Sequence, residues 1–270
     1  GVAYNSNDQR VITGSLAAGF VAFAEGHASI ALGQQSRAHD AYAVALGSES
    51  IAWGIESLSI GHNAIASWHQ DIAVGANAQA LGGSGTGNIA FGTDALVDNA
   101  TGGDTRDAIA MGTGARALAD NAVAVGAGAE ASGLNAIASG QLANASGEST
   151  SAYGNQSSAS DDYASAFGAY AYAGNAYASA FGVNAFAVGV NSAAFGYNAA
   201  AIGNNSLALG YNASATHDDS VALGSDSNAI GATLANAAYL VGGGARAEVN
   251  IGNRRITSVA AGAQDDDAVN

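Results

Sequence analysis

Small and large residues alternate along almost the whole chain, and glycine interrupts the alternation at regular intervals. Alanine recurs every seven residues from Ala17 to Ala80, with Ser59 as the one exception, and again from Ala110 to Ala229. Glycine recurs every 14 residues over two long stretches. A fixed period of this kind predicts a stack of similar structural units, each in contact only with its neighbours.

A period of seven residues first suggests a coiled coil, but the glycines argue against helices. Glycine inside a helix costs about 1 kcal/mol relative to alanine, and here it stands at nearly every second repeat boundary. Segments such as residues 44–47, Val-Ala-Leu-Gly, show the two-residue period of a strand. Each heptad is therefore predicted to form a strand and a tight turn, in which glycine supplies the positive φ.

The alternation assigns the side chains to two faces. The second and fourth residues before each turn are Ala or Ser, apart from exceptions at Asp71, Asn88 and Thr150, which we expect in irregular coils. Because such small side chains pack at short distance, this face is expected to line the interior of a thin roll. The predicted fold class is all-β: a roll of parallel strands with two strands in each 14-residue coil.

The first and third residues before each turn point outward, and here the two half-coils differ. They are large and apolar in the half that ends at the 14-residue glycines, and mixed or polar in the other half. An apolar stripe of this length exceeds what a monomer normally exposes, so we expect further copies of the chain to cover it. The predicted interface residues are Leu46, Ile60, Val74, Val125, Phe167, Phe181, Phe195, Leu209 and Leu223.

Composition excludes some classes of function. The net charge is -15 and all seven basic residues are arginine, so nucleic acid is not an expected partner. The chain has no cysteine and therefore no disulfide or thiolate metal site. No apolar run approaches the roughly 20 residues of a membrane-spanning helix.

Two segments resemble one known family. Residues 219–227 read DSVALGSDS, which resembles the head motif of trimeric autotransporter adhesins, roughly NSVAIGxxS, with Asp for Asn and Leu for Ile. Residues 255–262 read RITSVAAG and residues 267–270 read DAVN, which resembles the neck that joins the head of these adhesins to a coiled-coil stalk. The head-like pattern covers about residues 12–231.

The resemblance implies a left-handed parallel β-roll and a homotrimer. It implies a YadA-like head over residues 1–231 with insertions near 81–88 and 98–107, a connection over 232–248 and a neck over 249–270. The stalk is expected to follow outside this sequence. The neck residues to which we assign a role are Arg254, Arg255, Ile256, Val259 and Asp267.

The same resemblance implies a location and a function. The head is expected on the cell surface, at the outer membrane of a Gram-negative bacterium, in contact with the membrane only through a C-terminal anchor that this sequence does not include. It is expected to bind extracellular matrix proteins or host cells, with autoagglutination as an additional activity. The competing interpretation is a structural spacer that lengthens a surface fibre while adhesion lies elsewhere, and an enzyme built on a solenoid is a remote third.

The insertions and a few large side chains form the candidate adhesion surface, because loops on a rigid scaffold often carry binding residues. Glycine-rich insertions also arise by tolerated drift, and tryptophan also covers coil edges, so these alternatives stay open. Residues 82–87 are rich in glycine but lack the lysine of a phosphate-binding loop. The candidate adhesion residues are Arg37, Trp53, Trp68, Thr86 and Arg106.

No catalytic, cofactor or metal site is expected. The five histidines are scattered without the spacing of a metal site. Residues 265–267, three aspartates, lack the spaced ligands and glycine of a calcium loop, and we assign them to the junction of neck and stalk. Acyltransferases built on a left-handed helix repeat every six residues, whereas this chain repeats every seven. The sequence therefore predicts a non-enzymatic protein.

Overall fold

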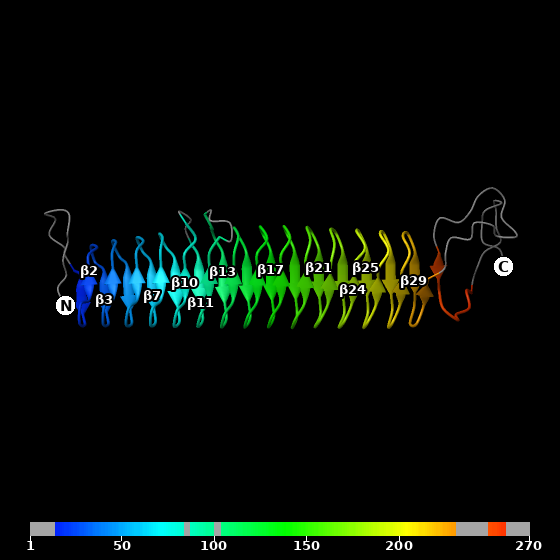
Figure 1. Cartoon of the computed structure of the whole chain (residues 1–270), viewed down its shortest axis with the longest axis horizontal. Coiled ribbons are helices and arrows are strands. Elements are labelled where there is room, and N and C mark those ends of the chain that lie inside the picture. Colours follow the sequence, from blue (N-terminus) through cyan, green and yellow to red (C-terminus); the bar gives the residue numbers. More distant parts are fainter. Residues whose placement is uncertain (1–13, 84–86, 100–103, 231–247, 258–270) are drawn as a thin grey trace.

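The computed structural model describes residues 14–83, 87–99, 104–230 and 248–257, and these residues form one elongated solenoid (Figure 1). Successive coils stack along the long axis, and each coil contributes one strand to each of two parallel sheets. The described residues contain no helix that could cross a membrane. The prediction of an all-β parallel roll with 14-residue coils is therefore confirmed.

The odd-numbered strands form a sheet of 16 strands, called here the odd sheet. Most of its strands have three residues, because the outward and inward positions alternate over one short stretch in each coil. The strands are β1 (Leu16–Ala18), β3 (Ile30–Leu32), β5 (Val44–Leu46), β7 (Leu58–Ile60), β9 (Ile72–Val74), β11 (Ile89–Phe91), β13 (Ile109–Met111), β15 (Val123–Val125), β17 (Ile137–Ser139), β19 (Ser151–Tyr153), β21 (Ser165–Phe167), β23 (Ser179–Phe181), β25 (Ala193–Phe195), β27 (Leu207–Leu209), β29 (Val221–Leu223) and β31 (Val249–Asn250).

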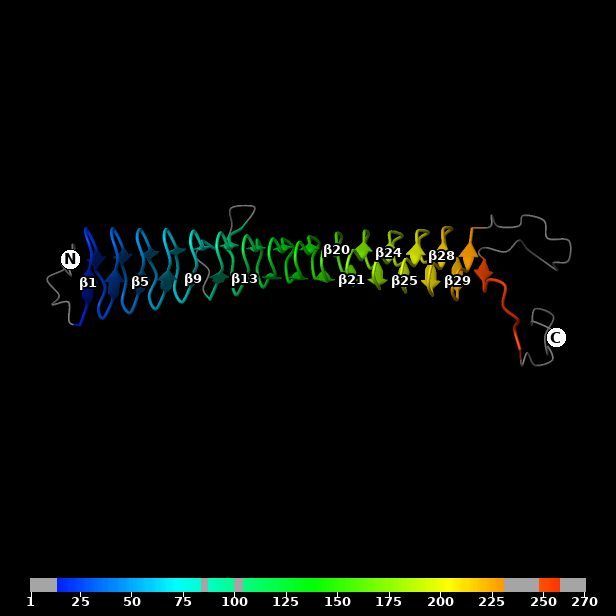
Figure 2. The ribbon, with the colours of Figure 1, turned by 90° about the horizontal axis from the view of Figure 1, so that it is seen from below.

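The even-numbered strands form the second sheet of 15 strands, the even sheet. Figure 2 separates the two sheets, with β20, β24 and β28 in one row and β21, β25 and β29 in the other. The even strands are β2 (Phe23–Ala24), β4 (Arg37–Ala38), β6 (Ile51–Ala52), β8 (Ile65–Ala66), β10 (Gln79–Ala80), β12 (Leu96–Val97), β14 (Arg116–Ala117), β16 (Glu130–Ala131), β18 (Asn144–Ala145), β20 (Ser158–Ala159), β22 (Tyr172–Ala173), β24 (Phe186–Ala187), β26 (Ala200–Ala201), β28 (Ser214–Ala215) and β30 (Asn228–Ala229).

The strand register follows the sequence period. In the regular coils a residue pairs with the residue 14 positions later, as Ile30 does with Val44. The register lengthens to 17 residues from Ile72 to Ile89 and to 20 residues from Ile89 to Ile109. The two coils therefore carry insertions of three and six residues, and the chain returns to the same sheet position after each of them.

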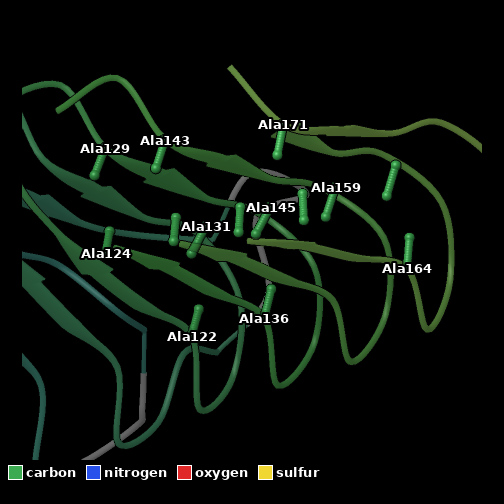
Figure 3. Packing of buried hydrophobic residues seen from close by; sticks show 14 of the residues in the cluster. Ala122, Ala124, Ala129, Ala131, Ala136, Ala143, Ala145, Ala159, Ala164 and Ala171 are labelled. Carbon is green, nitrogen blue, oxygen red and sulfur yellow. The ribbon is translucent and has the colours of Figure 1, made fainter. Parts of the chain in front are cut away.

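Alanine fills the space between the sheets. Figure 3 shows alanines of both sheets directed into one narrow interior, among them Ala124 and Ala131. Nearly all of the inward alanines are fully buried, and Val97 is the largest fully buried apolar side chain among the described residues. Because an alanine buries only one methyl group, the two sheets approach closely along the whole roll.

The expectation that Thr150 lies in an irregular coil is wrong. Thr150 is fully buried in a regular coil, and its Oγ1 donates to the carbonyl of Gly147 at 2.8 Å. Ser57 makes the same contact in an earlier coil, where its Oγ donates to the carbonyl of Gly54 at 2.7 Å. A threonine hydroxyl thus replaces a serine hydroxyl without a change in the coil. Asp71 and Asn88, in contrast, lie next to the two insertions.

The turns after the odd strands explain the period of the glycines. Gly182 has a φ of 137°, and a Cβ there would lie 2.3 Å from the carbonyl oxygen of Gly196 in the next coil. The expectation of turn glycines with positive φ is therefore confirmed. A second feature escaped the sequence analysis: the residue two positions after the turn glycine also has positive φ, which Asn tolerates well, as at Asn198 with 55°.

Candidate interaction surfaces

The roll offers two faces and two long edges for interaction. The odd face and the even face are the outward surfaces of the odd and even sheets. The glycine edge consists of the turns that follow odd strands, and every one of its regular turns begins with glycine. The insertion edge consists of the turns that follow even strands, such as residues 40–42, and it carries both insertions (Figure 1).

The odd face is an extended apolar surface. All nine predicted interface residues lie on it, on strands of one sheet. Their side chains are half-buried or exposed in the single chain, and Leu209 and Leu223 are each 42% exposed. The structure thus brings the predicted residues together in one plane.

A stack of aromatic rings occupies part of the odd face. The rings of Tyr153, Phe167, Phe181 and Phe195 follow one another at centroid distances of 4.9, 4.7 and 5.0 Å, with interplanar angles of 13° or less. These rings stack because parallel strands place equivalent residues of successive coils side by side. The position two residues earlier in each of these strands holds Ser or Ala.

The even face has a mixed character. Its central part is polar, with residues such as Asn144 and Ser158 pointing outward. Towards the C-terminal end it becomes apolar, where Tyr172 stacks on Phe186 at 5.2 Å and Phe186 is 42% exposed. Apolar residues also point outward in β6, β8 and β12 of its N-terminal half, so apolar and polar stretches follow one another on the even face, whereas apolar residues occupy nearly every strand of the odd face.

Two candidate adhesion residues, Arg37 and Trp53, lie towards the N-terminal end of the even face. The Arg37 guanidinium lies over the ring of Phe23, 5.6 Å from its centroid. The ring of His39 lies 4.8 Å from that of Trp53, and its Nε2 lies 3.3 Å from Oε2 of Glu25, an ion pair when His39 is protonated. Trp53 is exposed, so the cluster combines an accessible aromatic ring with charges of both signs.

The other candidate adhesion residues belong to the insertion edge. Trp68 begins the turn after β8 and is exposed, so it belongs to the insertion edge and not to the even face. Arg106 follows the second insertion, and its guanidinium lies 3.8 Å from the carboxylate of Asp104. Thr86 lies outside the described residues. The candidate residues therefore divide between the even face and the insertion edge.

Polar side chains are buried beneath the insertion edge. Asp71, Asn88 and Thr105 are fully buried, at depths where other coils have Ala or Ser. Asp71 Oδ2 accepts from the backbone N–H of Trp68 and Oδ1 accepts from that of Asn88, each at 3.0 Å. The sequence analysis assigned no role to these residues. The signal of Asp71 and Asn88 was a polar side chain at the interior position one coil before the residue that ends or follows each insertion.

The segment assigned to the neck begins within the roll. Its first residues form β31, which pairs in parallel with β29 and extends the odd sheet. The Arg254 guanidinium donates to the carbonyls of Ser225 at 2.7 Å and Ile251 at 2.9 Å, which fixes this segment to the last regular coil. Arg255 and Ile256 are exposed. Val259, Asp267 and residues 265–267 lie outside the described residues.

No group of three or more His, Asp or Glu side chains suitable for binding a metal ion occurs in the described part of the chain. Burial raises the pKa of the Asp71 carboxyl to about 6, although hydrogen bonds from Asn88 and Trp68 and the charge of His69 act in the opposite direction. The nearby charge of Glu148 raises the pKa of the exposed Tyr163.

Comparison with known proteins assigns the family. The YadA head domain repeat (2 copies) matches residues 24–50, 54–78, 106–129, 131–157, 145–171, 173–199 and 201–227, which together make up more than half of the chain. No curated protein matches this chain. Among solved structures, the crystal structure of the collagen-binding domain of the Yersinia adhesin YadA is 34% identical, over 62% of this chain and 79% of that one, with a TM-score of 0.40. The chain therefore belongs to the family of YadA head domain repeats and is an adhesin head.

Proposed function

We propose that the chain is a non-enzymatic head which assembles as a homotrimer and attaches a Gram-negative bacterium to extracellular matrix or host cells. Its membership of an adhesin-head family supports this function. The observation that carries the assembly is the apolar odd face, which runs along nearly the full length of the roll.

The small apolar area buried in the interior is a second argument for assembly. An alanine core buries little apolar area per residue, and about 25 cal/mol is gained per Å² of apolar area removed from water. The larger side chains Ile60, Val125 and Phe181 point away from this interior and stay partly exposed in the single chain. Two further copies around a common axis would bury them, and residues near the axis would then meet their own copies.

The even face and the insertion edge are the surfaces that this assembly leaves available for adhesion. Each candidate residue would be present three times, so weak contacts would add through multivalency. The net charge of -15 per chain favours basic or mixed-charge protein ligands, with binding that weakens as salt rises. The same charge disfavours nucleic acid.

The alternative is a spacer module that lengthens a surface fibre. An exposed Trp53 in contact with His39, on the same face as Arg37, favours the adhesive interpretation, because Trp and Arg are enriched in binding hot spots. Contact between heads on neighbouring cells would give autoagglutination by the same surfaces.

Binding to coated wells tests the proposal. The soluble protein is compared on collagen, fibronectin and laminin with two variants: one with both insertions shortened to the 14-residue period, and one with Arg37→Ala and Trp53→Ala. A variant with Asn144→Ala and Ser158→Ala is the control on the same face. We expect the first two variants to lose binding while the control retains it. Equal binding by all variants would mean that the assigned adhesion surface is wrong, and no binding by the wild type would favour the spacer.

A further inference from the structure

We propose that Asp71 and Asn88 are positioning residues that hold the bases of the two insertions, so that the described residues at these bases form a preformed surface for recognition on the insertion edge. The part of this inference that concerns recognition rests on the proposed function. The part that concerns the insertions rests on hydrogen bonds inside the roll.

The regular coils show what the insertions disturb. Where an even strand turns into the next odd strand, the first interior residue donates its backbone N–H to the carbonyl three residues earlier. Ser57 donates to Gly54 and Ala122 donates to Ala119, both at 3.2 Å. This bond closes the turn and satisfies a buried N–H that has no access to water.

After each insertion the corresponding N–H donates to a side chain of the preceding coil. The N–H of Asn88, which follows the first insertion, donates to Oδ1 of Asp71 at 3.0 Å. The N–H of Ala108, which follows the second insertion, donates to Oδ1 of Asn88 at 3.2 Å. Each insertion is therefore preceded, one coil earlier, by an interior acceptor for the N–H that follows it.

The same side chains join the two insertions to each other. Nδ2 of Asn88 donates to the carbonyl of Thr105 at 2.9 Å, and the N–H of Thr105 donates to the carbonyl of Gly82 at 2.9 Å. A Cβ at Gly82 would lie 2.6 Å from Nδ2 of Asn88, so glycine is needed where the first insertion leaves the roll. Such mutual fit argues that these insertions are built into the fold and are more than tolerated drift.

Burial makes the arrangement depend on both residues. Asp71 and Asn88 are fully buried, so replacing either with Ala would leave a buried N–H without its acceptor, which is strongly unfavourable. Other coils have Ala, Ser or, at Thr150, Thr at this position, and their N–H groups need no such acceptor. Polar side chains therefore stand in the interior where the insertions require them.

Burial makes the charged form of the Asp71 carboxyl less favourable in the folded protein. Because burial raises its pKa to about 6 from a model-peptide value near 3.8, folding favours the protonated form. Its contribution to the free energy of unfolding is therefore greatest below pH 3.8 and is lost as the pH rises through about 6. His69 is the charged neighbour that acts on it, while Glu56, Arg106 and Asp107 on the same edge are exposed.

A comparison of the full chain with a chain whose insertions are shortened to 14-residue coils tests the inference. Asn88→Ala should lower the melting temperature of the full chain by about 3 °C or more, and should have little effect in the shortened chain, where Ala108 follows a regular turn. Ser57→Ala, the control in a regular coil, should have equal effects in both. An equal loss from Asn88→Ala in both chains would overturn the inference.

Two measurements on the full chain keep the test independent of the shortened one. Asn88→Ala should speed proteolytic cleavage within residues 81–107 about tenfold, equivalent to about 1.4 kcal/mol, and Asn88→Asp, which restores the acceptor for Ala108, should recover part of the protection. Asp71→Asn should reduce the fall in melting temperature between pH 5 and pH 7.5. Unchanged cleavage, or an unchanged pH profile, would contradict the assigned roles.

These readouts use no ligand, so they separate the two proposals. If Asn88→Ala exposes the insertions to protease and also lowers binding to a coated surface, both the positioning role and the recognition role are supported. If cleavage increases but the Asn88→Ala variant binds the coated surface as well as the wild type does, Asp71 and Asn88 still hold the insertions, and the recognition part of the inference is wrong.

Discussion

The odd face and the even face share one interior but carry different outward residues. Both sheets turn fully buried alanines inward, with the same period and parallel register. On the odd face the outward residues are apolar or aromatic in nearly every strand, whereas the centre of the even face carries Asn and Ser. The comparison teaches that the interior defines the roll, while the outward residues distinguish its two faces, of which we propose that another chain covers the apolar one.

The two edges also differ, in the residues that the first position of their turns accepts. At the glycine edge the first turn residue has a φ that only glycine adopts readily, 134° at Gly168 and 137° at Gly182, so every regular turn begins with glycine. At the insertion edge the equivalent position also holds Asp40, Trp68 or Asp161. Both insertions emerge from this second edge, where the turns accept larger residues and longer connections.

The largest effect is expected from a charge on the odd face. Phe181→Asp would place a carboxylate from each copy in an apolar seam, and burial of unpaired charge is strongly unfavourable. We expect loss of the trimer by light scattering. Phe186→Asp, on the neighbouring strand of the even face, should leave assembly intact. A folded, soluble monomer of the wild-type protein would contradict the covered odd face altogether.

Truncation of the same two rings sharpens the comparison. Phe181 and Phe186 both stack on an aromatic neighbour within the chain. If only the odd face is covered, Phe181→Ala should cost about 3–5 kcal/mol per chain, as for a buried phenylalanine, and Phe186→Ala less than about 1 kcal/mol. Chemical denaturation measures both. Similar losses would mean that the even face is covered as well.

A smaller effect is expected from the interior. Ala180 is fully buried between the sheets, so Ala180→Leu should overpack it and cost about 1–3 kcal/mol per chain. Ser158→Leu, on the outward side of the even sheet, should hardly change the melting temperature. Equal shifts for these two variants would show that inward and outward positions have been assigned in reverse.

Most of the fold could be predicted because its determinants are local. The two-residue alternation around Ala45 or Ala124 identifies strands and their inward side within a few residues, and a constant spacing of 14 residues implies a constant register. The insertions were visible as breaks in that spacing. Thr150 was misjudged because residue size was taken as the criterion, whereas its hydroxyl makes the same contact as serine.

The candidate adhesion surface could be predicted only in part. The pattern selected Arg37, Trp53, Trp68 and Arg106, but it did not divide them between the even face and the insertion edge. That division depends on whether a residue lies on a strand or begins a turn, as Trp68 does. Neither the contact between His39 and Trp53 nor that between Arg37 and Phe23 could be predicted, because both depend on side-chain orientation across coils.

The sequence by itself determined the repeat, the strands, the small-residue interior and the apolar side of the roll, because each depends on the spacing of residue types along the chain. Only the tertiary structure showed that Asp71 and Asn88 support the insertions and that Arg254 fixes the last segment to the roll. These contacts join residues 17, 20 and 29 positions apart. The residues in these contacts become neighbours only when the coils stack, so no local pattern in the sequence predicts the contacts.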